Sequence, residues 1–428
     1  MKLFFILYIF CFTLLNANIQ LIKKENKDSN TTLLVIAGIH GNEPGGYFAA
    51  SILATHYEIL SKNLWIIPNL NKRSIIRNRR GIYGDMNRKF SRINTNDKDK
   101  NLIEEIKKII LSQKVSLVLN LHDGHGFYRK ENQGNIFNPN AWGQTCVIDQ
   151  CDLEENQEFG NLNDIAITVK DNVNKKLLKK HHSFDVKNTN TQYDDEAMQL
   201  SLTYFAVTNN KPAFAIETSK NLSSLSQKVF YQLLAIEEYM KIMGIKFKRN
   251  FDFNEIEIAK IINNYGTLSI NGNILLNLCD IKKSLSYIPI KSKSNIFKFS
   301  HPLGDIRKVK GKYLVFIGNK FVTSLKPQYF KLSENCHDKL DFVIDGKKIS
   351  LQNTSEFYVT ADFKVIKSKT QRVNIIGYQP KIAGDESKVT ISLSNLNKNY
   401  SVDKTNKVYR VEFYNKDEFC SMSMVHFK

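Results

Sequence analysis

The sequence predicts an α/β fold, a mixed and mostly parallel sheet covered by helices, followed by two small all-β domains. Three observations predict it. Strand-like runs alternate with helix-like segments from residue 31 to 245, short alternating apolar runs replace them after residue 248, and a second series of short runs begins near 338. Because parallel strands need long crossover connections, strand–helix alternation is typical of a parallel sheet.

In the first region, apolar runs bounded by turn residues predict buried strands, and apolar residues at helical spacing predict amphipathic helices. The expected strands cover 31–39, 63–68, 115–121 and 212–216, and the expected helices cover 47–60, 101–113, 165–180 and 224–243. Active sites of such sheets gather at the carboxyl ends of the strands, so we expect the site there.

The remaining chain carries short alternating runs separated by Gly and Asn turns, which predict strands. The first series covers 268–270, 274–278, 286–290, 313–317 and 321–325, and the second covers 342–344, 357–359, 373–378, 388–393 and 407–413. The first series indicates a small antiparallel β domain, and the second indicates a sandwich. We therefore expect domains at 18–245, 246–337 and 338–428.

The N-terminus resembles a secretory signal peptide. Lys2 precedes an apolar stretch from Leu3 to Leu15, and the small residue Ala17 follows, which predicts a signal peptide over residues 1–17. The apolar run is shorter than the ~20 residues that span a bilayer, and no later segment is apolar enough to do so. We therefore expect an exported protein without a transmembrane segment after cleavage.

The chain is strongly basic, with 61 Lys and Arg against 42 Asp and Glu and a net charge of +19. The basic residues are spread along the chain without an aromatic-interleaved stripe, so we expect no nucleic-acid partner. In an exported protein this charge favours an anionic wall polymer, such as a cell-wall glycopeptide. A genome rich in A and T would explain the abundance of Lys and Asn equally well.

Five cysteines remain after the expected cleavage, so at least one thiol is free or intermolecular if the others pair. They are Cys146, Cys151, Cys279, Cys336 and Cys420. Cys146 and Cys151 could close a small loop in an oxidising compartment, or could be two buried thiols. The sequence leaves both interpretations open.

Two strand ends carry candidate metal ligands. His40 and Glu43 lie three residues apart on a Gly-rich turn after the first strand, and His122 closes the strand over 115–121. His-Glu-His with an open fourth position is typical of hydrolytic zinc. Asp123 or a nearby carbonyl could orient a ring nitrogen, and we expect His125 to face substrate or solvent.

Two further segments carry polar groups suited to catalysis. Glu217 ends the apolar strand over 212–216, where a carboxylate could act as a general base or form a salt bridge. The segment from Arg77 to Arg88 holds four arginines, including Arg80, and it also holds Asn87. Arginine can bind a carboxylate through two hydrogen bonds and polarise a carbonyl. A basic loop of this kind is otherwise usually solvated.

Together these segments resemble the M14 family of zinc carboxypeptidases over roughly residues 31 to 245. His40-x-x-Glu43 matches the paired ligand motif, His122 matches the distant third ligand, and Glu217 matches the catalytic glutamate. The interval from Glu43 to His122 is short, as in the aspartoacylase and succinylglutamate desuccinylase branch. For the family's active-site tyrosine, Tyr204 and Tyr193 are only candidates.

The arginine segment adds to this resemblance. Asp85-Met86-Asn87-Arg88 resembles the Asn-Arg pair that holds the terminal carboxylate of the substrate, and Arg80 matches the arginine that polarises the scissile carbonyl. The resemblance implies that Asn87 and Arg88 bind the free chain end while Zn²⁺ and Arg80 activate the carbonyl. Trp142 could form a wall for the glycan or stem peptide, or could be an ordinary core residue.

The signal peptide and the two C-terminal β domains are similar to those of the helical-cell-shape carboxypeptidases of curved and spiral bacteria. This resemblance implies a periplasmic D,L-carboxypeptidase that trims peptidoglycan muramyl tripeptide to dipeptide by removing terminal diaminopimelate. It also implies a zinc carboxypeptidase-like fold, a last domain resembling an immunoglobulin sandwich, and β domains that could bind other cell-wall or cell-shape proteins.

Two other functions stay open at this point. A zinc-dependent deacylase of N-acyl amino acids would suit the desuccinylase-like spacing, although export argues against its cytosolic substrates. A non-catalytic wall-binding protein would suit the basic β domains, although the glutamate base and the open ligand set argue against it.

Overall fold

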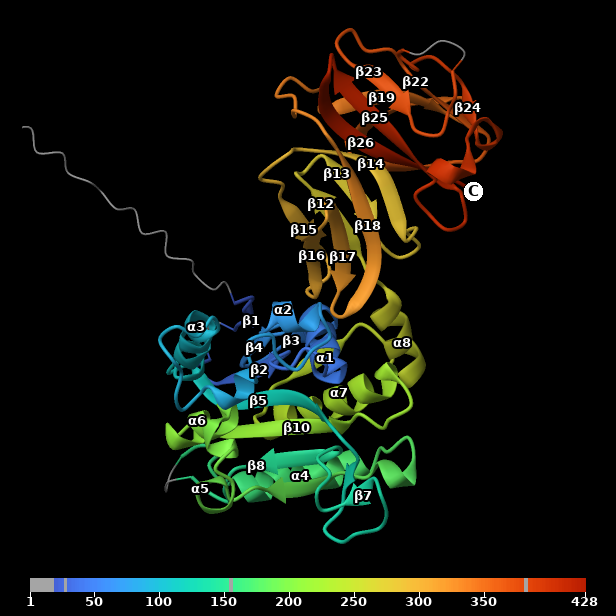
Figure 1. The fold of residues 1–428 in the computed structure, drawn as a ribbon. Coiled ribbons are helices and arrows are strands. Elements are labelled where there is room, and N and C mark those ends of the chain that lie inside the picture. The colour runs from blue at the N-terminus through green and yellow to red at the C-terminus, as the bar shows by residue number, and fades with distance from the viewer. Residues whose placement is uncertain (1–18, 27–28, 154–156, 381–383) are drawn as a thin grey trace, which may run out of the picture.

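The computed structural model describes residues 19–26, 29–153, 157–380 and 384–428. The expected signal peptide, residues 1–17, lies outside these residues. An α/β unit stands at one end of the molecule, and the β part extends from it to the C-terminus (Figure 1). Within the described ranges, no helix has the length and apolar character needed to cross a membrane. The predicted fold class is confirmed.

The α/β unit is built on a seven-stranded sheet in the order β1-β4-β2-β5-β10-β8-β9. β4, β2, β5 and β10 run parallel, whereas β1 and β8 are antiparallel to their neighbours β4 and β10. The strands are β1 (Ile22–Lys24), β2 (Thr32–Ala37), β4 (Asn63–Ile67), β5 (Val115–Gly124), β8 (Thr145–Ile148), β9 (Asp185–Asn188) and β10 (Ala213–Ser219). The sheet is therefore mixed and mostly parallel.

Helices cover both faces of this sheet. α7 packs between α1 and α4 on one face and also contacts α8, whereas α6 lies on the other face with α3 beside it (Figure 1). The helices are α1 (Pro44–His56), α2 (Lys72–Ile75), α3 (Lys100–Ile110), α4 (Leu162–Asn174), α5 (Thr191–Asp194), α6 (Leu202–Thr208), α7 (Leu225–Ile242) and α8 (Glu255–Asn263). The core strands β2 and β4 are fully buried between these layers.

Several boundaries differ from the sequence prediction. The helix expected over 47–60 begins at Pro44 and ends at His56, and the next residues form β3 (Tyr57–Ile59), which pairs with β11 (Phe247–Arg249). The helix expected over 165–180 is α4, which ends at Asn174. β5 and β10 continue through the polar residues that were expected to follow them, because these residues keep pairing in register.

The described residues of the β part form three sheets. Their orders are β15-β12-β13-β26-β25-β23 with β21 also on β26, β14-β18-β17-β16, and β20-β19-β22-β24. The strands are β12 (Thr267–Ile270), β13 (Ile274–Asn277), β14 (Ser284–Ile290), β15 (Phe297–Phe299), β16 (Gly304–Val309), β17 (Lys312–Ile317), β18 (Lys320–Tyr329), β19 (Lys339–Ile344), β20 (Lys347–Gln352), β21 (Glu356–Val359), β22 (Asp362–Val365), β23 (Arg372–Ile375), β24 (Ile391–Ser392), β25 (Val408–Asn415) and β26 (Glu418–Phe427). A separate apolar core fills the C-terminal sandwich.

The two β modules share a sheet, which the sequence did not predict. β13 of the first module pairs with β26 of the second, and β14 is parallel to β18, so the first module is not purely antiparallel. At its other end the first module packs on the α/β unit, where the Asn69 amide donates to the Pro302 carbonyl and the Asn319 amide to Asn78. The domain boundaries near 246 and 338 stay predictions.

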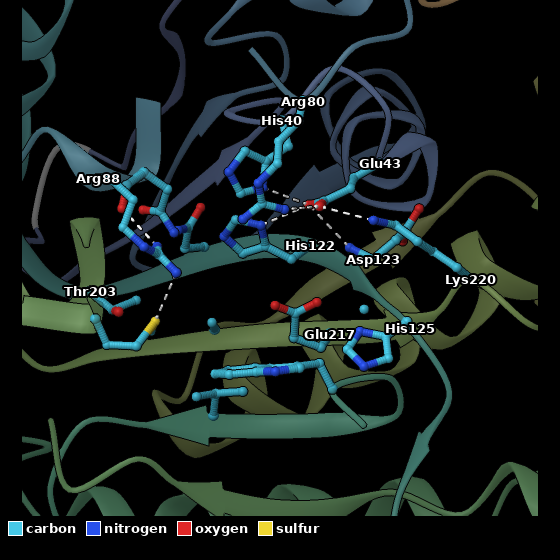
Figure 2. A pocket seen from close by; sticks show the side chains of 17 residues that line it. His40, Glu43, Arg80, Arg88, His122, Asp123, His125, Thr203, Glu217 and Lys220 are labelled. Atoms are coloured by element: carbon cyan, nitrogen blue, oxygen red, sulfur yellow. Dashed lines mark hydrogen bonds and ion pairs between the residues drawn. The ribbon is translucent and has the colours of Figure 1, made fainter. Parts of the chain in front are cut away.

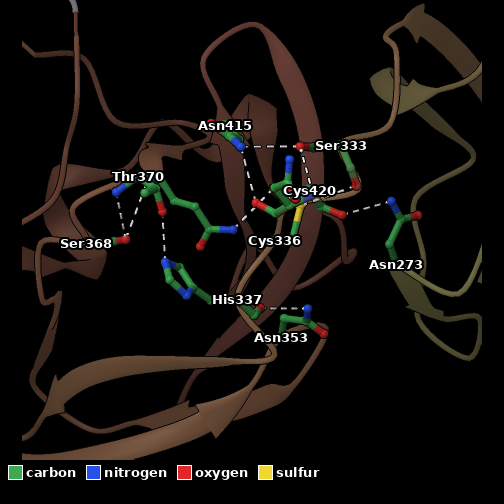
Figure 3. The surroundings of a disulfide bond; sticks show 11 residues. Asn273, Ser333, Cys336, His337, Asn353, Ser368, Thr370, Asn415 and Cys420 are labelled. Atoms are coloured by element: carbon green, nitrogen blue, oxygen red, sulfur yellow. Dashed lines mark hydrogen bonds between the residues drawn. A yellow bond between two sulfur atoms is a disulfide. The ribbon is translucent and has the colours of Figure 1, made fainter.

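A disulfide joins Cys336, just before β19, to Cys420 on β26, across a sequence separation of 84 (Figure 3). On either side, the Ser333 backbone N–H donates to the Phe419 carbonyl, and the Asn273 amide donates to the Cys420 carbonyl. Cys146 and Cys151 are unpaired, the first buried and the second exposed. The structure therefore excludes a disulfide between them, and the burial expected for both thiols holds only for Cys146.

Candidate metal centre and catalytic cavity

The turn after β2 brings His40 and Glu43 to the end of β5, beside His122. Close packing needs glycine here, because a Cβ at Gly41 would lie 2.0 Å from the Ser74 carbonyl carbon and one at Gly45 would lie 2.3 Å from a carboxylate oxygen of Asp123. One ligand atom from each of the three residues lies within 4.8 Å of the others, and all three residues are buried. Figure 2 shows the two imidazoles facing the Glu43 carboxylate.

The donor set suits a cation. His40 Nδ1 lies 3.1 Å and His122 Nδ1 2.8 Å from the same Glu43 oxygen. Burial alone would raise the pKa of Glu43, but the two histidines outweigh it and hold that pKa well below its usual range. Burial is the main cause that lowers the pKa of His122. Two neutral imidazoles and one carboxylate are a ligand set for a divalent transition metal.

Asp85 supports this centre from the arginine segment. Its Oδ1 lies 2.7 Å from His40 Nε2, and its Oδ2 accepts from Arg80 Nε at 2.8 Å. Burial opposes ionisation of Asp85, but His40 and Arg80 outweigh it and lower the pKa of this carboxyl. A neutral His40 that donates Nε2–H to Asp85 keeps its Nδ1 lone pair for a metal. The three residues therefore fit the ion, and Asp85 fixes the orientation of His40.

Glu217 lies on β10 directly opposite His122 of β5 in the parallel register. Burial raises the pKa of Glu217 well above its usual value, and the neighbouring Glu43 and Asp123 carboxylates raise it further. The environments of Glu43 and Glu217 therefore shift their pKa values in opposite directions. Such a pair is typical of sites in which one carboxylate stays ionised and the other exchanges a proton.

The cavity around these groups has a volume of about 270 Å³ and two distinct ends. Arg88 and Thr203 lie on one side of the ligand residues, and His125 and Lys220 lie on the other (Figure 2). Arg88 is the last residue of the short 3₁₀ helix η1 (Met86–Arg88) and lines the cavity. Its Nη2 lies 3.5 Å from the Met198 sulfur. Each end of the cavity therefore has a basic side chain, Arg88 or Lys220, that can bind an anionic group of a ligand.

All the site residues predicted from the sequence line this one cavity, although their roles stay predictions. They are His40, Glu43, Arg80, Asn87, Arg88, His122, Trp142 and Glu217. Asn87 has a further structural contact, because its side-chain oxygen accepts from the Leu202 backbone N–H at 3.0 Å. Neither tyrosine candidate lines the cavity, and Tyr193 is 76% exposed.

Sequence reasoning missed several other cavity residues, among them Asn120, Met198, Thr203 and Lys220. Lys220 Nζ lies 3.3 Å from Glu43 Oε1, and its place three residues after Glu217 was a usable signal. Asn120 lies two residues before His122 in an apolar run, which was a second usable signal. Met198 and Thr203 carry no local signal, because only the packing of α6 and of the segment before it brings them to the site.

The fold and the site are typical of a metal-dependent hydrolase, because a His-Glu-His ligand set and a glutamate share one cavity. Residues 1–263 match the family model described as the catalytic part of the carboxypeptidase controlling helical cell shape, and residues 333–428 match the C-terminal domain of metallo-carboxypeptidase. The chain belongs to this family of carboxypeptidases.

Solved structures agree with this assignment. The chain is 32% identical to apo Csd4, a cell shape determinant of Helicobacter pylori, with a TM-score of 0.90 over 96% of this chain and 100% of that one. It is 33% identical to the mDAP-bound form of the same D,L-carboxypeptidase, with a TM-score of 0.90 over 95% of this chain and 100% of that one. No curated protein sequence matches.

Proposed function

We propose that this chain is a periplasmic, zinc-dependent D,L-carboxypeptidase that removes terminal diaminopimelate from peptidoglycan muramyl tripeptide. The observation that carries the proposal is the joint placement of a His-Glu-His ligand set, a glutamate base and two arginines in one cavity. The mDAP-bound and tripeptide-bound forms of Csd4 support the substrate. The Cys336–Cys420 disulfide supports an oxidising compartment.

A zinc ion held by His40, Glu43 and His122 would supply Lewis-acid chemistry. Arg88, with the Asn87 amide, binds the free carboxylate of the last residue, so that only a chain end reacts. The Arg80 guanidinium donates to the scissile carbonyl oxygen and stabilises the negative charge that develops there. Glu217 takes a proton from the attacking water and later gives it to the leaving amine.

Mass analysis of muramyl tripeptide incubated with the purified, zinc-loaded protein tests this function. We expect the stem to lose one terminal residue, and we expect a stem amidated at its chain end to react much more slowly, because Arg88 then lacks an anionic partner. Arg88→Ala is the matched variant and should lose most of this preference for the free acid. Equal cleavage of both stems by the wild type would exclude an exopeptidase.

Asp85→Asn should lower zinc affinity by about 10- to 100-fold, the range typical of residues that orient a metal-bound histidine. The reason is that Asp85 fixes His40 and Arg80 with the same carboxylate. A competition titration with a zinc chelator would measure the change. Asp97→Asn is the control, since Asp97 pairs with Lys89 outside the cavity. Equal affinity in the two variants would contradict this role of Asp85.

A further inference from the structure

One part of the cavity wall is formed by a set of residues that are in register across the sheet. This set lies next to the in-register pair His122 and Glu217, which we call the catalytic row. His122 and Glu217 face each other across β5 and β10, and two residues earlier Asn120 faces Ala215 in the same register. Ala215 in turn faces Val147 on β8. Because side chains two residues apart share a face of a strand, Asn120, Ala215 and Val147 form a floor beside the catalytic row. All three line the cavity.

Asn120 is the one side chain of this floor that can form hydrogen bonds. It is 1% exposed, and among the described residues neither its Oδ1 nor its Nδ2 has a hydrogen-bond partner. A buried amide without hydrogen-bond partners is destabilising. An amide at a cavity floor, with both its donor and its acceptor unused, is therefore suited to bind a polar group of a ligand.

No charged side chain stands in register with Asn120, although Glu217 of the catalytic row follows two residues after Ala215. Its register neighbours are Ile36 on β2 and Ala215 on β10, with Val147 beyond. The carboxylate of Asp123 is already used, since it accepts from the Gly45 backbone N–H and the Thr218 hydroxyl. Lys220 lies at the far end of the cavity, with His125 (Figure 2). A ligand group with a net charge would therefore find no oppositely charged partner within this row, which is unfavourable for a buried charge.

The floor lies on the Arg88 side of the cavity, where the last residue of the substrate would bind. Asn120 precedes His122 on β5, whereas His125 follows the end of that strand, and His125 lies on the side of the cavity opposite Arg88 and Thr203 (Figure 2). Arg88 is placed to bind the terminal carboxylate of the substrate. The side chain of the substrate's last residue then extends towards the floor. Ala215, with its small side chain, leaves room above it.

We propose that Asn120 is the specificity-determining residue for the side chain of the cleaved residue, and that it selects an end carrying both an ammonium and a carboxylate. The proposal rests on the proposed function. The amide oxygen accepts from the ammonium and the amide N–H donates to the carboxylate, so a zwitterionic end satisfies both halves of Asn120 and brings no net charge. A lysine end satisfies only the oxygen and adds an unpaired charge.

Tripeptide stems that end in meso-diaminopimelate, lysine or alanine provide the test. For the wild type we expect kcat/KM to be at least about 10-fold higher for diaminopimelate than for lysine. Asn120→Leu, similar in size, should lower kcat/KM for the diaminopimelate stem by about 10- to 100-fold and change that for the alanine stem much less. Asn120→Asp should shift the preference towards lysine, because it places an anion on the floor.

Zinc content and thermal melting of each variant are measured beside Asn209→Leu, a control at the exposed end of α6. If the wild type cleaves none of the stems, the proposed function fails. If it cleaves the diaminopimelate stem but both Asn120 variants keep the wild-type ratios, the role of Asn120 is overturned. A wild type that prefers lysine overturns it as well, and that comparison needs no variant to fold.

Discussion

Glu217→Gln should lower kcat by roughly 10²- to 10⁴-fold, the range typical of losing a general base, while the protein still binds metal. The amide keeps the size of the side chain but can neither accept a proton from water nor give one to the leaving amine. Glu217 is not among the three residues that meet at the metal centre, so zinc content should stay at the wild-type level.

This separation of rate from metal content distinguishes a base from a structural salt bridge at the strand end. Steady-state kinetics on the tripeptide stem and metal analysis of the same sample measure both quantities. Glu131→Gln, on an exposed loop outside the cavity, is the matched control and should leave kcat unchanged. Full activity of Glu217→Gln would remove Glu217 from the mechanism, and loss of zinc would show a role in metal binding instead.

The site residues could be predicted where the signal is local. His40 and Glu43 lie on one Gly-rich turn, and His122 and Glu217 follow apolar runs that could only be buried strands. Parallel strands place their carboxyl ends at one edge, so these groups had to meet. The link through Asp85 could not be predicted, because it depends on how the arginine segment folds back onto His40.

Long-range pairing explains the other differences. Tyr57–Ile59 continues a helical pattern in the sequence, yet it forms a strand because β11, from a distant part of the chain, pairs with it. Likewise, sequence proximity offered Cys146 and Cys151 as one possible pair and left it open, whereas the disulfide joins Cys336 to Cys420. Neither contact has a local cause that the sequence could show.

Replacing both disulfide cysteines, as Cys336→Ser with Cys420→Ser, should lower the unfolding free energy of the C-terminal module by about 2–5 kcal/mol. The bond closes a long loop, so its loss restores much conformational freedom to the unfolded chain. The effect should extend to the first β module, since β26 carries Cys420 and also pairs with β13. The α/β unit has its own catalytic cavity, so kcat at low temperature should change little.

Thermal melting followed by circular dichroism, with and without a reductant, measures this effect. Reductant should lower the melting temperature of the wild type but not that of the double variant. Cys151→Ser, which removes an exposed unpaired thiol, is the control and should melt as the wild type does. If the double variant also melted as the wild type does, the disulfide would not stabilise the module. The shared sheet through β13 and β26 would then account for how the two β modules are held together.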